Sequence, residues 1–207
     1  MSTLRIIRYR DLTAVPWKNG LGITREIAFE PAAKLGAGFR FRLSRAVIDA
    51  QAAFSNYPGV RRWLLLARGG ALELRFDGRP SHQLERVGEF CAFSGDDVVE
   101  GVPLDGSSED FNLMLGDPAL DAELLVRPMV GSMILHQPAG QWLVFHVLDG
   151  HAHVQGQSGV LSMGDTLLAY PEADDRIAAR IDGGGLVLIL RITLRADQGD
   201  PRERGGG

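Results

Sequence analysis

The stretch 61-RRWLLLARGGALEL-74 has a counterpart in the second half of the chain, 141-QWLVFHVLDGHAHV-154. When Gly70 is set opposite Gly150, each stretch reads as an apolar strand, a glycine and a second strand. Such a pattern predicts a glycine-centred hairpin in each half. The sequence therefore indicates that one arrangement of β-strands occurs twice.

Short strands account for most of the remaining chain. Gly88 and Gly164 follow the two repeats at similar distances, and each precedes an acidic residue and another apolar strand. Glycine and proline interrupt the sequence at short intervals, which is typical of all-β folds. The clearest strands are predicted at 24–30, 39–48, 61–67, 71–76, 88–93, 141–148, 164–170 and 185–194.

One short helix is expected, at 117-DPALDAELLVRP-128. Asp117 would cap it, Pro118 would occupy its first position and Pro128 would end it. A helix or linker at this place would divide the chain into residues 1–116, with the ligand pocket, and residues 117–207, with a disordered glycine-rich tail.

The repeated order of strand, glycine and strand is the rhythm of a cupin, and two cupins in tandem form a bicupin. The predicted fold class is therefore all-β, a tandem cupin of two antiparallel β-barrels or sandwiches with little helix. The alternative is that two unrelated β-meanders align equally well.

Composition excludes several classes of function. The net charge of −4 is modest and both signs are interspersed, so we expect no nucleic-acid partner. The chain has no apolar run long enough to span a membrane and no recognisable signal peptide, which predicts a cytoplasmic protein without a membrane partner.

The histidines do not match the metal-binding pattern of many cupins. Neither half has the two histidines and the glutamate before the glycine, nor the later histidine. His151 and His153 follow Gly150 on one face of the predicted hairpin, and with His146 they form at best an incomplete site. We therefore expect no metal and no cofactor.

Polar side chains gather instead in the first half. Alternation along 39-FRFRLSRA-46 places Arg40, Arg42 and Ser44 on one face, where they are costly to bury without an anionic partner. The alternative is a strand face exposed to solvent. Two further segments bring polar side chains: 54-FSNYPGVRR-62, with Arg61 and Arg62, and 109-EDFNLML-115, with Asp110 and Asn112 on one face.

The turn 17-WKNGLG-22 precedes the strand at 24–30. Asn19 and Gly20 form a strong turn signal, and glycine permits both positive φ and the close approach of another group. We interpret the turn as a pocket rim with Trp17 packed beneath Lys18 and Asn19. A purely structural turn is the alternative.

Taken together, five segments resemble the HutD/Ves family of bicupins. They are 17-WKNGLGITREIA-28, 39-FRFRLSRA-46, 54-FSNYPGVRRWLLLARGGALEL-74, 93-FSGDDVV-99 and 110-DFNLML-115. The resemblance implies a bicupin without the usual metal and a regulatory or accessory role in histidine utilisation. Leu21, Phe41 and Gly116-Asp117 depart from the family pattern and bear on the identity of the ligand.

The residues and the resemblance lead to two main hypotheses, and a purely structural or scaffolding role is the third. The first is a binding protein, more readily than an enzyme, for a small carboxylated metabolite such as the N-acyl amino acid formylglutamate. The second is an enzyme, an isomerase or N-acyl hydrolase, with Glu26 as base. The predicted ligand-binding residues are Trp17, Lys18, Asn19, Thr24, Glu26, Arg42, Ser44, Arg62, Asp110 and Asn112. The sequence leaves open the identity of the ligand, the existence of a homodimer and which of Arg42, Arg61 and Arg62 reaches the pocket.

Overall fold

The computed structural model describes residues 4–17 and 20–195. Within these residues helix is confined to one 3-10 turn, η1 (Tyr9–Asp11), and the remaining regular structure is antiparallel β-sheet. None of the helical structure described is long and apolar enough to cross a membrane. The predicted all-β fold class is confirmed.

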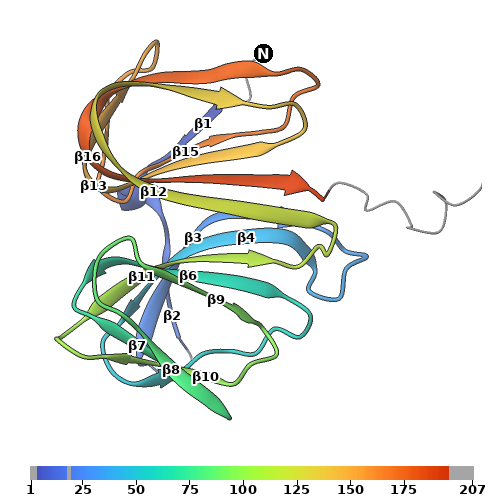
Figure 1. The fold of residues 1–207 in the computed structure, drawn as a ribbon, viewed down its shortest axis with the longest axis vertical. Coiled ribbons are helices and arrows are strands. Elements are labelled where there is room, and N and C mark those ends of the chain that lie inside the picture. Colours follow the sequence, from blue (N-terminus) through green and yellow to red (C-terminus); the bar gives the residue numbers. More distant parts are fainter. Residues whose placement is uncertain (1–3, 18–19, 196–207) are drawn as a thin grey trace, which may run out of the picture.

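The described residues form three sheets (Figure 1). The N-terminal sheet has the order β2 (Ala14–Pro16), β3 (Gly22–Pro31), β4 (Phe39–Ile48), β11 (Ser108–Leu115), β6 (Arg61–Gly69) and β9 (Phe90–Ser94). The small sheet has the order β5 (Ala52–Ala53), β10 (Val99–Pro103), β7 (Leu72–Phe76) and β8 (Arg79–Leu84). These two sheets lie against each other in the lower part of Figure 1.

The C-terminal sheet forms the upper part of the molecule (Figure 1). Its order is β1 (Leu4–Ile7), β15 (Thr166–Ala169), β13 (Trp142–Val154), β16 (Arg176–Leu194) and β12 (Leu120–Gln137), with β14 (Val160–Ser162) paired to β13. Among the strands that the structure describes, β1 alone lies in the sheet of the other half, because it pairs with β15 across the predicted boundary after residue 116. The division into two domains stays a prediction.

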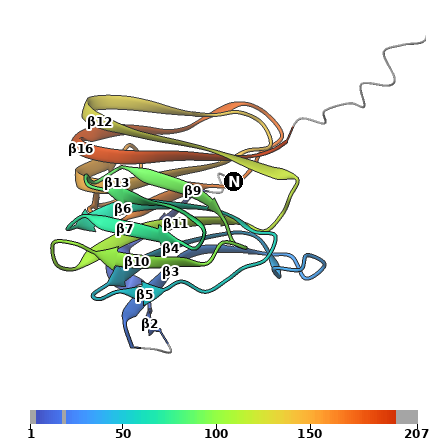
Figure 2. The same cartoon turned by 60° about the horizontal axis from the view of Figure 1, so that its bottom comes forward.

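Apolar side chains form three large buried clusters. One cluster joins the N-terminal and C-terminal sheets and includes Phe41, Leu113 and Trp142. A second fills the interior of the bent C-terminal sheet, and a third lies between the N-terminal and small sheets. The turned view in Figure 2 shows the C-terminal sheet layered over the N-terminal sheet.

The predicted helix at 117–128 is wrong. Asp117 does accept a hydrogen bond from the Ala119 N–H, at 2.9 Å, but it closes a turn and β12 begins at Leu120. From there every second side chain packs inward and those between are more exposed, and the whole strand pairs with β16. The alternation of inward-facing and exposed side chains in LDAELLVR and the pairing with β16 therefore outweigh the helix-capping signal at Asp117.

The predicted glycine hairpins are also wrong. β6 and β7, which flank Gly70, belong to different sheets. β13 runs without interruption through Gly150, which has φ of 83° and lies opposite Gly185 in β16. A Cβ on Gly150 would collide with the carbonyl oxygen of Gly184. Neither glycine is therefore the centre of a hairpin: Gly70 lies between strands of different sheets, and Gly150 lies inside a single strand.

Candidate functional site

A cavity of about 570 Å³ opens in the first half of the chain. It is lined by Val15, Pro16, Trp17, Thr24, Glu26, Arg42, Ser44, Ala46, Ala53, Phe54, Ser55, Tyr57, Arg62, Asp110, Asn112 and Met114. Every predicted site residue that the structure describes is on this list, whereas Lys18 and Asn19 lie outside the described residues. The structure thus brings the predicted residues together, and their role in binding stays a prediction.

Strand register explains why these side chains meet. Glu26, Ser44 and Asn112 stand opposite one another on β3, β4 and β11. The neighbouring row consists of Arg42, Met114 and Arg62 on β4, β11 and β6. Because residues two apart on a strand share a face, both rows face the cavity.

Arg62 is the most deeply placed cation of the cavity, with 5% of its surface exposed. Its guanidinium lies over the rings of Phe93, Phe54 and Tyr57, with 4.8 Å between the guanidinium carbon and the centre of the Phe93 ring. Nη1 donates to the carbonyl of Ser55 at 3.3 Å, while Nε has no hydrogen-bond partner. Burial lowers the pKa of Arg62, and the nearby Asp110 opposes that change.

Asp110 is the buried acid of the cavity and is 1% exposed. Burial raises the pKa of its carboxyl to about 7, although Arg62, Arg45 and the Ala46 N–H favour the ionised form. Its Oδ1 has no hydrogen-bond partner, nor has Oδ1 of Asn112. Three buried polar atoms of residues that line the cavity, one donor and two acceptors, therefore have no hydrogen-bond partner among the described residues.

Arg42 and Glu26 form an ion pair nearer the solvent. Arg42 Nε donates to Glu26 at 2.9 Å, and both side chains are partly exposed. Arg61 is held elsewhere, since it pairs with Asp121 at 3.2 Å and does not line the cavity. Of the three arginines left open by the sequence, Arg42 and Arg62 reach the cavity.

The turn at the cavity rim depends on Gly22. Trp17 donates from Nε1 to the Thr24 hydroxyl at 2.7 Å and packs edge-on against Phe54. A Cβ on Gly22 would lie 2.9 Å from the Trp17 ring and 2.7 Å from the carbonyl oxygen of Val47. Glycine at this position thus allows the indole to lie in the wall of the cavity.

Aromatic side chains of the cavity were missed by the sequence reasoning. Phe54 and Tyr57 line it, whereas the prediction from 54-FSNYPGVRR-62 uses only the arginines of that segment. A signal was present, because both rings precede a Pro-Gly turn that brings the chain back to Arg62. Aromatic walls with a few polar groups are common in small-molecule sites.

A buried polar cluster joining the two halves was missed as well. Arg45 forms an ion pair with Glu109 at 2.8 Å, and Tyr9 donates its hydroxyl to Glu109 at 2.7 Å. Arg45 also donates to His146 Nε2 at 3.1 Å, and His146 Nδ1 lies 2.8 Å from Thr166 Oγ1. Since a guanidinium can only donate, His146 is the neutral tautomer with its proton on Nδ1.

The histidines do not form a metal centre in the described residues. Burial lowers the pKa of His146, which is fully enclosed, whereas His151 and His153 are exposed. No group of three or more His, Cys, Asp or Glu side chains in the described ranges could hold a metal ion. The expected absence of a metal stays a prediction.

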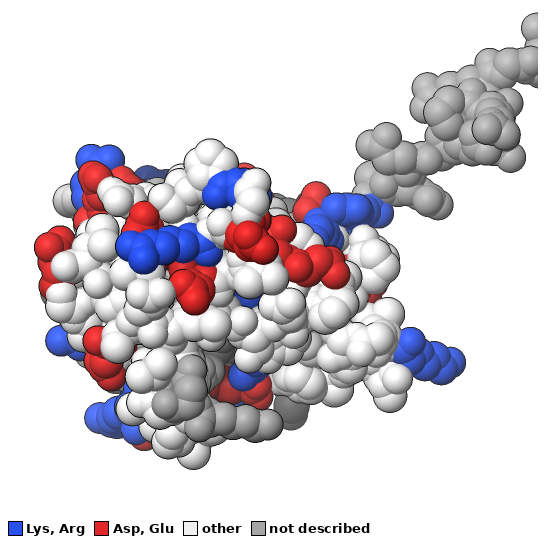
Figure 3. Space-filling model, turned by 90° about the horizontal axis from the view of Figure 1, so that it is seen from below, with Lys and Arg blue, Asp and Glu red and all other residues white. Residues whose placement is uncertain are grey.

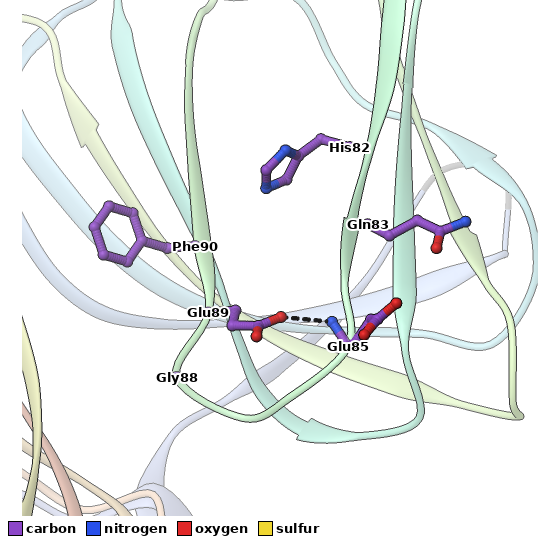
Figure 4. A pocket seen from close by; sticks show the side chains of 6 residues that line it. All are labelled: His82, Gln83, Glu85, Gly88, Glu89 and Phe90. Atoms are coloured by element: carbon purple, nitrogen blue, oxygen red, sulfur yellow. Dashed lines mark hydrogen bonds between the residues drawn. The ribbon is translucent and has the colours of Figure 1, made fainter.

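A second hollow, of about 450 Å³, lies at the edge of the first half (Figure 4). His82 and Gln83 come from β8, Phe90 from β9, and Glu89 from the intervening loop, where it accepts a hydrogen bond from the Glu85 N–H at 2.8 Å. Its lining side chains are mostly exposed, unlike the buried groups of the larger cavity.

On the face in Figure 3 acidic and basic side chains are interspersed.

Comparison with known proteins places the chain in a family. The family model of HutD matches residues 9–189. An uncharacterised 21.2 kDa protein from the hutC 3' region of Pseudomonas putida is 38% identical over 145 residues, which cover 70% of this chain and 74% of that protein. Protein Ves of Escherichia fergusonii is 37% identical over 113 residues, which cover 52% and 57%.

Solved structures agree with this result. A conserved protein of unknown function from Pseudomonas aeruginosa PAO1 has 34% identity and a TM-score of 0.79, covering 93% of this chain and 100% of that one. HutD from Pseudomonas fluorescens SBW25 has 28% identity and a TM-score of 0.76, covering 94% and 100%. The bacterial pirin YhhW of Escherichia coli shares the fold, with a TM-score of 0.62 at 12% identity over 94% and 100%. The chain therefore belongs to the HutD family.

Proposed function

We propose that the chain is a metal-free binding protein whose first half holds a small carboxylated metabolite, as a regulator or accessory protein of histidine utilisation. An N-acyl amino acid such as N-formylglutamate represents the class of ligand. The observation that carries the proposal is the buried guanidinium of Arg62, which lines a cavity of about 570 Å³ and whose Nε has no hydrogen-bond partner among the described residues.

The energetics of Arg62 favour an anionic ligand. A buried guanidinium is costly unless its donors and its charge find partners. Aromatic rings cover Arg62 and offer no hydrogen-bond acceptor comparable to a carboxylate, while one weak bond to Ser55 satisfies Nη1. A ligand carboxylate would supply charge and acceptors together, in the fork geometry that arginine binds well.

The other lining residues suit the rest of such a molecule. The Thr24 hydroxyl accepts from Trp17, so its own proton is available to a ligand. Asn112 Oδ1 is an unpaired acceptor for an amide N–H, and Ser44 stands beside it on β4. Trp17 and Phe54 supply apolar wall, while Arg42, oriented by Glu26, adds charge nearer the mouth.

The link to histidine utilisation is drawn from relatives. One relative is named for the hutC 3' region, and a structural neighbour is named HutD. Membership of the same family supports a role near this pathway.

Isothermal titration and thermal unfolding with N-formyl-L-glutamate test the proposal, with its uncharged dimethyl ester as the ligand control. At a hundred times the dissociation constant, binding should add about 2.7 kcal/mol to the free energy of unfolding. Arg62→Met should abolish this gain. Arg68→Met, which removes an exposed arginine of the same strand, should keep it. If glutamate, urocanate and N-formylglutamate all fail to stabilise the wild-type protein, the proposal is wrong.

One observation favours an enzyme as the second candidate. A general base works best with a pKa near the working pH, and burial raises the pKa of Asp110 to about 7. Asp110 is thus better suited to this role than Glu26, which is held by Arg42. Release of formate from N-formylglutamate, followed by NMR and lost in Asp110→Asn, would favour the enzyme over the binding protein.

A further inference from the structure

Asp110 and Arg62 share one cavity in which a ligand anion has to compete with a protein carboxylate. Both side chains are almost completely buried and line the same cavity, and each one alters the pKa of the other. Any carboxylate bound at Arg62 therefore enters the electrostatic field of Asp110.

The other charged groups around Asp110 are already engaged. Arg45, on β4, is held by Glu109 at 2.8 Å and by His146. Arg42 is held by Glu26 at the mouth of the cavity. Glu109, the preceding residue on β11, adds a negative charge that disfavours ionisation of Asp110. Among the described residues, Arg62 is thus the cation that Asp110 would share with a ligand.

A second carboxylate near Arg62 changes the balance for Asp110. Two carboxylates in a buried site repel each other, and the common result is that one of them takes a proton. Once protonated, Asp110 changes from an acceptor into a hydrogen-bond donor, which suits the oxygens of a bound carboxylate. Its buried Oδ1 has no hydrogen-bond partner among the described residues.

We propose that the pocket binds its anionic ligand together with one proton, which Asp110 takes up from solvent. This inference rests on the proposed function, and it makes Asp110 a determinant of which charge state of the site accepts a carboxylate. The ligand keeps its negative charge, and no bond other than the new O–H of Asp110 is formed.

The pH dependence follows from linkage. Burial sets the pKa of Asp110 at about 7 in the empty pocket, and a bound carboxylate raises it further. At pH 6 Asp110 is already mostly protonated, so binding takes up little additional proton. Above pH 7 uptake approaches one proton, and affinity falls by about tenfold for each pH unit until the pKa of the bound state is reached.

Titration calorimetry with N-formyl-L-glutamate tests this inference, at pH 6 in Mes and in Bis-Tris and at pH 8 in Hepes and in Tris. The two buffers at each pH differ in ionisation enthalpy, so the difference in measured heat gives the number of protons taken up. We expect about 0.1 proton at pH 6 and about 0.9 at pH 8, from a free pKa near 7. The probe has no group of its own that titrates in this range, because its amine is acylated.

Asp110→Asn is the matched variant, since its side chain has nearly the same shape and cannot take up the proton. Its affinity should be the same at both pH values, with uptake near zero. Binding by the wild-type protein without proton uptake at pH 8 would overturn the inference and leave the proposed function standing. Absence of binding at both pH values would overturn both. The wild-type result decides the matter even if the variant does not fold.

Discussion

The two halves of the chain have interiors of opposite character. Between the N-terminal and small sheets, Arg62, Asp110 and Asn112 line a cavity beside an aliphatic cluster. Inside the bent C-terminal sheet the buried cluster is apolar, with Phe145, Leu161 and related side chains. Related strand arrangements thus produce a hollow polar interior and a filled apolar one. The difference lies in the side chains at inward-facing positions. In the second half these side chains are apolar and are stabilised by packing against each other, whereas in the first half they include polar groups that a ligand would stabilise.

Between these interiors lies a shared apolar interface with a polar cluster in it. Arg45 and Glu109 come from the first half, and His146 and Thr166 from the second. The side chains of all four residues are buried. The cluster therefore ties the two interiors together, and it is where a substitution should affect stability most.

Arg45→Met should cause the largest loss of stability, and it tests how strongly the two halves depend on each other. Glu109 would remain buried with only the Tyr9 hydroxyl, and the free energy of unfolding should fall by about 3–5 kcal/mol. Urea denaturation measures the loss. The double variant Arg45→Met/Glu109→Gln should recover part of it, and additive losses would contradict the ion pair as the cause.

Asp110→Asn tests the buried acid of the first interior. The folded pKa of about 7 lies above the unfolded value of 3.8, so Asp110 contributes most stability below pH 3.8 and that contribution is lost as pH rises to about 7. Relative to the variant, the wild-type protein should lose up to about 4 kcal/mol between pH 4 and pH 8. Urea titrations of both proteins measure the difference in their free energies of unfolding. A difference that does not change with pH would show that folding does not shift the pKa of Asp110.

A pair of truncations compares the interiors directly. Leu161→Ala removes a fully buried side chain from the packed second interior and should cost about 2–4 kcal/mol. Ser44→Ala alters the wall of the first cavity and should cost less than about 1 kcal/mol while weakening ligand binding. Equal losses of stability would mean that the cavity wall is packed as tightly as the second core.

Gly22→Ala probes the rim of the first cavity. The added methyl would meet the Trp17 ring and the carbonyl of Val47, so we expect a loss of about 1–3 kcal/mol and weaker binding. Gly36→Ala, at a site with no atom within 4 Å of the added methyl, is the control and should change stability by about 0.5 kcal/mol or less. Thermal unfolding distinguishes the two variants.

Treatment with a metal chelator should have the smallest effect on stability. Because the predicted fold depends on no metal, EDTA should leave the melting temperature of tag-free protein unchanged. About one metal per chain in elemental analysis, lost in His151→Ala or His153→Ala, would instead make the second half the functional one.

Much of the candidate site could be predicted from local sequence. Alternation places Arg42 and Ser44 on one face of β4 and Asp110 and Asn112 on one face of β11, and both faces line the cavity. The period of a strand is a local property, so these relations hold whichever strand lies next to it. The motifs also led to the correct family.

Other features were decided by the tertiary structure. The capping signal at Asp117 competed with a period of two, and only the partner β16 shows which prevails. Gly150 lies within a continuous strand because β13 pairs with β16 on both sides of it. Both results depend on pairing with a strand that is distant in the sequence. A local sequence pattern does not include the free energy that such pairing contributes.

The sequence by itself determined the all-β class, the faces of the site strands β4 and β11 and the family, because each depends on neighbouring residues or on motifs. The tertiary structure alone decided that Arg62 is buried, that Asp110 shares its cavity and that Arg45 reaches His146, 101 residues away. Burial and pairing of charges are properties of the assembled sheets, and they set the pKa of Asp110 and the chemistry that we propose for the pocket.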